Sequence, residues 1–109
     1  MNSNDEPSLE PETPAAVLKV DEVASPGAED AYWRLNYLKR AYVERNRPYS
    51  DYRPAYRYGW ESRARLGGSF HDAESELGLG WDKVKGGSRL VWTQAKHAAS
   101  DAWHRIART

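Results

Sequence analysis

One group of side chains near the end of the chain has the spacing of a metal site. His97, Asp101 and His104 stand at i, i+4 and i+7, so a helix would place them on one face. Imidazoles and carboxylates are ligands of Zn²⁺, but a closed site needs a further ligand, which only His71 or scattered acidic residues could supply. We therefore interpret the group as a solvent-facing surface pairing, and we predict no metal.

Other reaction chemistry has little support in the sequence. The chain has no cysteine, which excludes thiolate ligands, disulfides and a cysteine nucleophile. Residues 67–69 (Gly-Gly-Ser) resemble an anion site at a helix start, but the lysine and the other glycines of a phosphate loop are missing. The acidic residues at 72–76 suit the positive end of a helix. We expect no catalytic residue, no cofactor and no small-molecule substrate, and hence no enzyme.

Arginines and aromatic rings alternate over residues 32–65, and this is the strongest candidate for a binding surface. Arginines pair with phosphates, and exposed rings stack on unpaired bases. Helical spacing offers a second interpretation, in which Tyr52, Tyr56 and Trp60 form a core stripe and arginines cover their rings. The candidate interaction surface consists of residues off that stripe: Arg53, Arg57, Tyr58 and Arg65.

The elements that position these residues follow a repeated pattern. Trp60, Trp81 and Trp103 each follow a small residue and precede basic residues, at spacings of 21 and 22. A fixed period of this length indicates a stack of similar units. Around each tryptophan the spacing 3, 4, 4, 3 is typical of one helix face. The three faces are Tyr49, Tyr52, Tyr56, Trp60 and Arg63; Phe70, Ala73, Leu77, Trp81 and Val84; and Trp92, Ala95, Ala99, Trp103 and Ile106.

Local signals set the predicted helix boundaries near 51–66, 70–85 and 89–107. Ser50 or Asp51, Ser69 and Ser88 suit the N-terminal caps, and glycines follow the first two helices. We expect Trp81 and Trp103 each to be buried against the other's helix.

A fourth helix is predicted over 29–46, with Ala31, Leu35, Leu38 and Tyr42 on one face. Short connections favour antiparallel neighbours. The predicted fold is all-α: three or four short antiparallel helices built from a Trp repeat of 21–22 residues.

Charge divides the chain into two parts. Residues 1–30 carry eight Asp and Glu against one Lys, with four prolines and no tryptophan or tyrosine, whereas residues 31–109 carry fifteen Lys and Arg against eight acids. We predict a disordered acidic arm over 1–30 and a helical repeat domain over 31–109. Such asymmetry is found in proteins with a polyanionic partner or an intramolecular clamp. The interpretation we prefer from the sequence is that the acidic arm only keeps a small basic body in solution. Because neither a signal peptide nor a long apolar segment is visible, we expect a cytoplasmic protein with no membrane contact.

The run Tyr-Arg-Pro-Ala-Tyr-Arg-Tyr-Gly at 52–59, the spaced tryptophans and Ala102-Trp103 resemble small bacterial Trp/Tyr-rich helical proteins of unassigned function. The resemblance covers roughly residues 48–106 and implies no catalytic or ligand residue.

The predicted function is that of a non-enzymatic interaction module that binds a protein partner or self-associates, since a small core poor in aliphatic residues gains from further burial. The alternative is a nucleic-acid-binding or nucleoid-associated protein, with the acidic arm as an autoinhibitory phosphate mimic.

Overall fold

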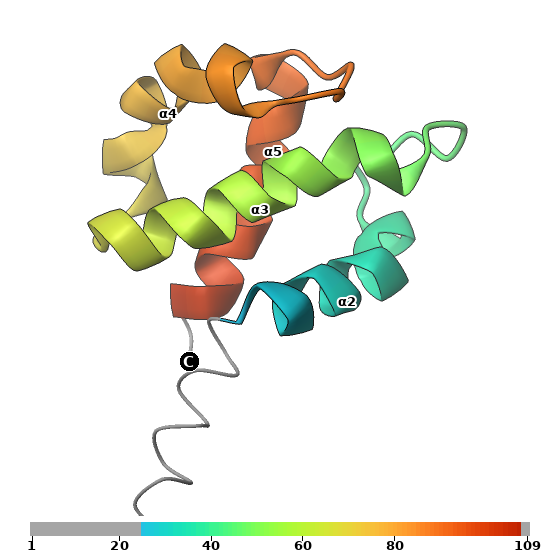
Figure 1. Ribbon diagram of the computed structural model, residues 1–109, viewed down its shortest axis with the longest axis horizontal. Helices are drawn as coiled ribbons and strands as arrows, with labels where there is room; N and C mark the ends of the chain where they lie inside the picture. Colours follow the sequence, from blue (N-terminus) through green and yellow to red (C-terminus); the bar gives the residue numbers. More distant parts are fainter. Residues whose placement is uncertain (1–24, 108–109) are drawn as a thin grey trace, which may run out of the picture.

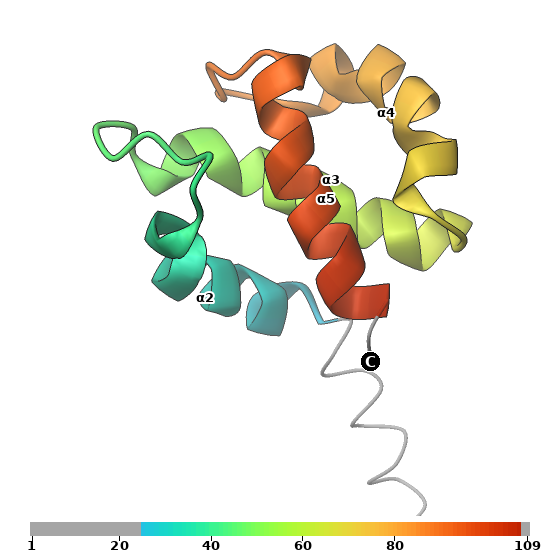
Figure 2. The ribbon, with the colours of Figure 1, turned by 180° about the vertical axis from the view of Figure 1, so that it is seen from behind.

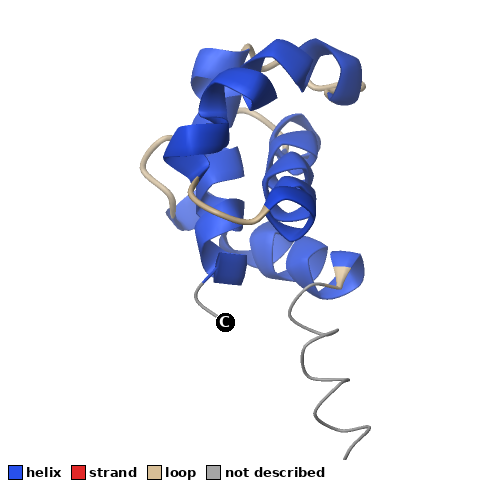
Figure 3. Ribbon diagram, turned by 90° about the vertical axis from the view of Figure 1, so that its left-hand side faces the viewer, coloured by secondary structure: helices blue, strands red, loops and turns tan. Residues whose placement is uncertain are grey.

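The computed structural model describes residues 25–107, which form a helical body (Figures 1 and 2). Its elements are α2 (Pro26–Asn36), the 3₁₀ helix η2 (Tyr37–Lys39), α3 (Tyr49–Leu66), α4 (Phe70–Val84) and α5 (Trp92–Ala107). Over these residues there is no strand (Figure 3), which confirms the all-α prediction. None of the described helices is long and apolar enough to span a bilayer. Of the predicted arm, 1–24 lies outside the described residues; 26–30 belong to α2, so the body begins earlier than predicted.

The centre of the fold is the crossing of α3 and α5, which make the most extensive helix contact of the described body (Figures 1 and 2). Gly59 of α3 and Ala99 of α5 meet at this crossing, where a Cβ on Gly59 would be 2.1 Å from the Ala99 carbonyl oxygen. On α5 the buried residues around Ala99 are small as well: Ala95, Ala98 and Ala102. Small side chains let the two backbones approach closely, so these positions fix the crossing.

The other two α-helices lie on opposite sides of α3, with α4 above it and α2 below it in Figure 1. On α2, the ring of Trp33 stacks on Tyr56 of α3, with centroids 4.3 Å apart. On α4, Phe70 meets Trp103 of α5 edge-on at 5.7 Å. Contact between α3 and α4 is slight. The structure therefore does not confirm a stack of repeated units, because the main neighbour of α3 is α5 and not the next helix in sequence.

The predicted helix faces do supply most of the core. Trp60, Trp81 and Trp103 are at most 3% exposed. The expected burial of Trp81 and Trp103 against each other's helices is confirmed. Trp81 contacts Trp92 of α5, and Trp103 contacts Phe70 of α4. Of the face residues on α4, Val84 is the exception, at 46% exposed.

The boundary between α3 and α4 follows the predicted signals. Gly67 and Gly68 adopt φ values of +65° and +73°, a region that costs a residue with a Cβ more than it costs glycine. The Ser69 hydroxyl accepts a hydrogen bond from the Asp72 amide at 3.1 Å. The cap prediction at Ser69 is therefore confirmed.

The other two cap predictions are wrong. Because α3 begins at Tyr49 after Pro48, Ser50 and Asp51 lie within its first turn. Ser88 precedes α5 by several residues, and its hydroxyl instead donates to the Asp51 carbonyl at 2.6 Å. This long-range bond ties the segment before α5 to α3, and α5 begins at Trp92.

The single helix predicted over 29–46 is also wrong. The chain leaves helical geometry after Lys39. Leu35 and Leu38, which the spacing places on one helix face, are 79% and 41% exposed. The buried residues of α2 are Glu29 and Trp33. The Trp33 ring stacks on Tyr56 of α3, and Arg105 of α5 pairs with Glu29, so the face with Trp33 and Glu29 turns inward.

Candidate functional site

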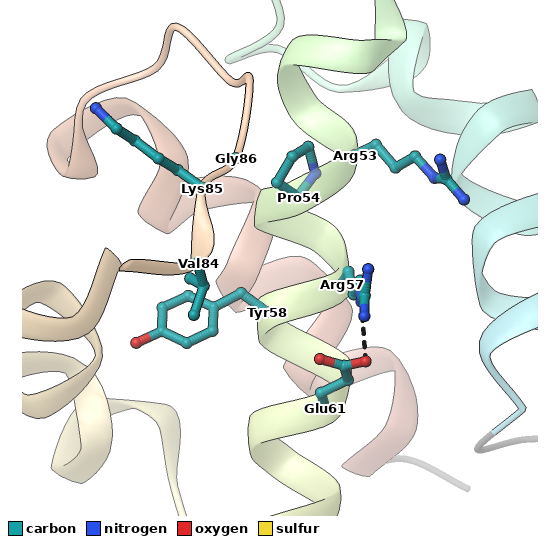
Figure 4. A pocket seen from close by; sticks show the side chains of 8 residues that line it. All are labelled: Arg53, Pro54, Arg57, Tyr58, Glu61, Val84, Lys85 and Gly86. Carbon is teal, nitrogen blue, oxygen red and sulfur yellow. Dashed lines mark hydrogen bonds and ion pairs between the residues drawn. The ribbon is translucent and has the colours of Figure 1, made fainter. Parts of the chain in front are cut away.

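A groove of about 350 Å³ opens between α3 and the end of α4, and we call it the α3 groove (Figure 4). Three of the four predicted interaction residues line it, namely Arg53, Arg57 and Tyr58. The full lining is Arg53, Pro54, Arg57, Tyr58, Glu61, Val84, Lys85 and Gly86. The fourth predicted residue, Arg65, is exposed near the end of α3 and does not line the groove.

Helical geometry explains why these side chains gather. Arg53, Arg57, Glu61 and Arg65 follow one another at intervals of four, so they form one row along α3. Pro54 lies inside α3, where its missing N–H leaves the helix ladder one bond short. In Figure 4, the Pro54 ring lies between Arg53 and the end of α4.

The rim of the groove is basic. Arg53, Arg57 and Lys85 are opposed there by Glu61 alone among the lining residues. Arg57 donates to Glu61 at 2.9 Å, and these two side chains are 64% and 49% exposed. Exposed pairs of this kind contribute about 0–1 kcal/mol. A carboxylate from outside can therefore replace Glu61 at Arg57 at little cost.

The floor of the groove is apolar and fixed. Tyr58 donates its hydroxyl hydrogen to the Leu77 carbonyl of α4 at 2.8 Å. Its ring contacts Trp81 and Trp92, and burial raises the pKa of Tyr58. The helical spacing places Tyr58 off the core stripe. In the structure its side chain is half-buried and connects α3 to α4 through the hydrogen bond to Leu77. The other apolar wall is Val84.

A second hollow, of about 170 Å³, lies where α2 begins, and we call it the α2 hollow. It shares Arg53, Arg57 and Glu61 with the α3 groove, so the two adjoin the same row of side chains. Its full lining is Pro26, Asp30, Arg53, Arg57, Trp60 and Glu61. Over residues 25–107, the buried indole N–H of Trp60 has no hydrogen-bond acceptor.

Asp30 connects α2 to the basic row. Its carboxylate accepts from Arg53 at 3.0 Å, from Tyr49 at 3.0 Å and from Arg34 at 3.0 Å. Burial alone would raise the pKa of Asp30, but the hydrogen bonds from Arg34 and Tyr49 and the charge of Arg53 outweigh it and lower the pKa. Arg53 is nevertheless 56% exposed, and its side chain extends toward α2, away from Val84 and Lys85 (Figure 4).

The three residues of the predicted His–Asp–His group have different partners in the structure and do not form one site. Asp101 is half-buried and accepts from Arg40 at 2.7 Å and from Tyr42 at 2.6 Å. Since Tyr42 gives its hydrogen to Asp101, Tyr56 must donate to Tyr42 in their 2.8 Å contact. The expectation that this face of α5 is solvated is therefore wrong at Asp101, because the segment after η2 covers it.

The two histidines of that group are exposed, as expected. His97 stacks on Tyr42 with ring centroids 5.6 Å apart, and Nδ1 of His104 lies 2.8 Å from the Ser100 carbonyl oxygen. Within residues 25–107, no cluster of three or more His, Cys, Asp or Glu has the arrangement of a metal site.

Sequence reasoning missed a buried carboxylate, Asp51. Its side chain is 4% exposed and accepts from Arg89 at 2.8 Å and from Arg47 at 3.3 Å. The Arg89 hydrogen bonds are the main cause of the lowered pKa of Asp51. Arg89 is 38 residues away along the chain, so no local spacing signals this pair.

A second missed carboxylate is Glu29, which is 1% exposed. Arg105 donates to its Oε1 at 3.0 Å and lies 3.6 Å from the centroid of the Tyr32 ring. The other oxygen, Oε2, is buried and finds no donor among the described residues. Burial raises the pKa of Glu29 despite the charge of Arg105.

The chain matches no protein-family model, no curated protein and no solved structure. The chemistry of the α3 groove and of the α2 hollow is therefore the basis for assigning a function.

Proposed function

We propose that the protein is a non-enzymatic interaction module that binds an acidic, extended segment of a partner protein, or of a second copy of the chain, in the α3 groove. The observation that carries this proposal is a basic rim above an apolar floor. Arg53, Arg57 and Lys85 supply the cations, and Tyr58 and Val84 supply the floor. Arginines bind carboxylates through paired, charge-assisted hydrogen bonds, and apolar side chains of the same segment cover the exposed Val84.

A protein segment fits this groove better than a nucleic acid does. Base stacking needs an aromatic face that is free to receive the base, whereas Tyr58 is packed against Trp81 and Trp92 and is anchored to α4 by its hydroxyl. A nucleic-acid ligand is the competing outcome of the experiment below.

The experiment is affinity capture from native cell extract, run with and without nuclease, with the full chain and two charge-reversal variants. Arg57→Glu reverses a groove cation. Arg45→Glu is the matched control, because Arg45 is exposed and lines neither the groove nor the α2 hollow. We expect wild type and Arg45→Glu to retain a protein partner that Arg57→Glu loses. If nuclease abolishes the capture, the ligand is a nucleic acid. If Arg57→Glu still captures the partner, the groove is not the binding surface.

A further inference from the structure

We infer that residues 1–24 of the chain lie across the row of Arg53 and Arg57 in the free protein and occupy the α3 groove until a partner displaces them. This inference rests on the proposed function, because the segment and the partner use the same groove. Three observations carry it: charge, the place where α2 begins, and the adjacency of the two hollows.

The two parts of the chain carry opposite net charges. Residues 25–107 hold fourteen Lys and Arg against ten Asp and Glu. Residues 1–24 hold six acids against Lys19, and the acids are Asp5, Glu6, Glu10, Glu12, Asp21 and Glu22. Such a segment is attracted to the basic rim of the groove over distances of about a Debye length.

The structure places the start of α2 at the α2 hollow, beside the row of Arg53 and Arg57. Pro26, the first residue of α2, lines the α2 hollow together with Arg53 and Arg57. Asp21 and Glu22 precede Pro26 by only a few residues, and an extended chain spans about 3.3–3.6 Å per residue. Both carboxylates can therefore reach the arginine row without a long tether.

The path from the α2 hollow to the groove is short. The two share Arg53, Arg57 and Glu61, so a segment passing between them crosses the width of one helix, about 10 Å. Residues 5–12, which hold the remaining acids, have ample length to reach Lys85 on the far rim. Arg57 holds an exposed ion pair with Glu61, which incoming carboxylates can replace. Arg53 is paired with the partly buried Asp30, but its own side chain is 56% exposed and can bind a second carboxylate.

The tether favours the chain's own segment over that of a second copy. Covalent attachment a few residues from the site gives an effective concentration on the order of millimolar. Occupation within one molecule is therefore the expected state.

Paramagnetic relaxation in the full chain tests the contact. Because the sequence has no cysteine, a Ser8→Cys variant carries a single spin label between the acidic residues. We expect the label to broaden the amide signals of Arg53, Arg57 and Lys85. The effect should vanish in the added background of Arg57→Glu and persist in that of Arg45→Glu. Broadening that is absent, uniform, or centred on the exposed Leu35 of α2 would overturn the inference.

Isotope mixing separates the chain's own segment from that of a neighbour. Isotope-labelled protein without a spin label is mixed with spin-labelled protein that lacks the isotope. We expect no broadening in this mixture. Broadening there would show that the segment binds a second copy, which contradicts the inference and agrees with the self-associating form of the proposed function.

A final titration distinguishes failure of this inference from failure of the proposed function. The probe is a synthetic peptide of residues 1–24, titrated against wild type and against a full chain whose six acids in 1–24 are replaced by Asn and Gln. We expect the neutralised chain to bind about tenfold more tightly, because the groove of the wild type is occupied. Equal binding to both chains overturns only the inference. Binding to neither overturns both proposals.

Discussion

Gly59 of α3 lies directly against the backbone of Ala99 on α5, with no room for a side chain between them. This contact fixes where the two central helices cross. It also turns the row of Arg53 and Arg57 outward, since both are exposed while Gly59 is buried. The groove therefore depends on a glycine that does not line it.

Gly59→Ala should disrupt the crossing. The new Cβ would stand 2.1 Å from the Ala99 carbonyl oxygen, and overpacking against backbone costs about 3 kcal/mol or more. The free energy of unfolding in urea measures this loss. Gly27→Ala in α2 is the matched control, because its nearest neighbour is 3.8 Å away, and it should be neutral or stabilising by up to about 1 kcal/mol. Equal losses in the two variants would contradict the crossing.

Trp103→Ala should destabilise the protein by about 3–5 kcal/mol, the usual cost of removing a buried large side chain. Trp103 is 1% exposed and donates its indole hydrogen to the Gly68 carbonyl at 3.3 Å. Chemical denaturation followed by far-ultraviolet circular dichroism gives the value. Leu79→Ala removes an apolar side chain that is 85% exposed and should stay within about 0.5 kcal/mol of wild type. A small effect at Trp103 would place this ring outside the core.

Tyr58→Phe should weaken the link between α3 and α4 but keep the groove floor. It removes the hydrogen bond to the Leu77 carbonyl, which contributes about 0.5–1.5 kcal/mol. The melting temperature should fall while binding of an acidic peptide is unchanged. Tyr32→Phe, on an exposed ring, should leave the melting temperature nearly unaltered. A Tyr58→Phe variant as stable as wild type would mean that the hydroxyl is not engaged.

Stability should fall as the pH drops through about 4, where unfolded aspartates protonate. Because the pKa of Asp51 is lowered in the folded protein, the unfolded state takes up the proton first, so stabilisation present above that pH is lost below it. Asp51→Asn should lower stability at neutral pH and flatten this acid slope. The exposed carboxylate of Asp82, which is 87% exposed, is the control. If Asp82→Asn flattens the slope equally, the buried pair is not its source.

Much of the core was predictable from local signals, and the arrangement of the helices was not. The 3, 4, 4, 3 spacing predicted the burial of Trp60, Trp81 and Trp103 because helical periodicity is a property of neighbouring residues. The repeat suggested that α3 stacks on α4. Gly59 instead admits α5 more closely, and such a choice between partners depends on contacts far apart in sequence.

The α2 region shows the same limit. Leu35 and Leu38 have helical spacing, but Trp33 and Glu29 turn inward because their partners, Tyr56 and Arg105, come from distant helices. For this reason the acidic arm cannot extend to residue 30, because residues 26–30 belong to α2. A deletion variant that removes the arm should therefore remove only residues 1–24.

The candidate site was likewise half predictable. Arg53 and Arg57 follow from their interval of four on one helix. Lys85 and Val84 could not be assigned, because only the tertiary fold brings the end of α4 beside α3. Packing also changes the role of Tyr58, from a free ring to a structural anchor.

The most direct measurement of the central claim is a titration of the full chain, with the acids of residues 1–24 neutralised, at about 0.15 M salt. One ligand is a peptide of alternating Glu and Leu, and the other is an oligothymidylate of matching charge. Amide shifts report where each binds. We predict that the peptide shifts Arg53, Arg57 and Lys85, that Arg57→Glu abolishes binding while Arg45→Glu does not, and that the oligonucleotide binds more weakly. Tighter binding of the oligonucleotide, or equal peptide binding by the two variants, would contradict the assignment of the α3 groove to acidic protein segments.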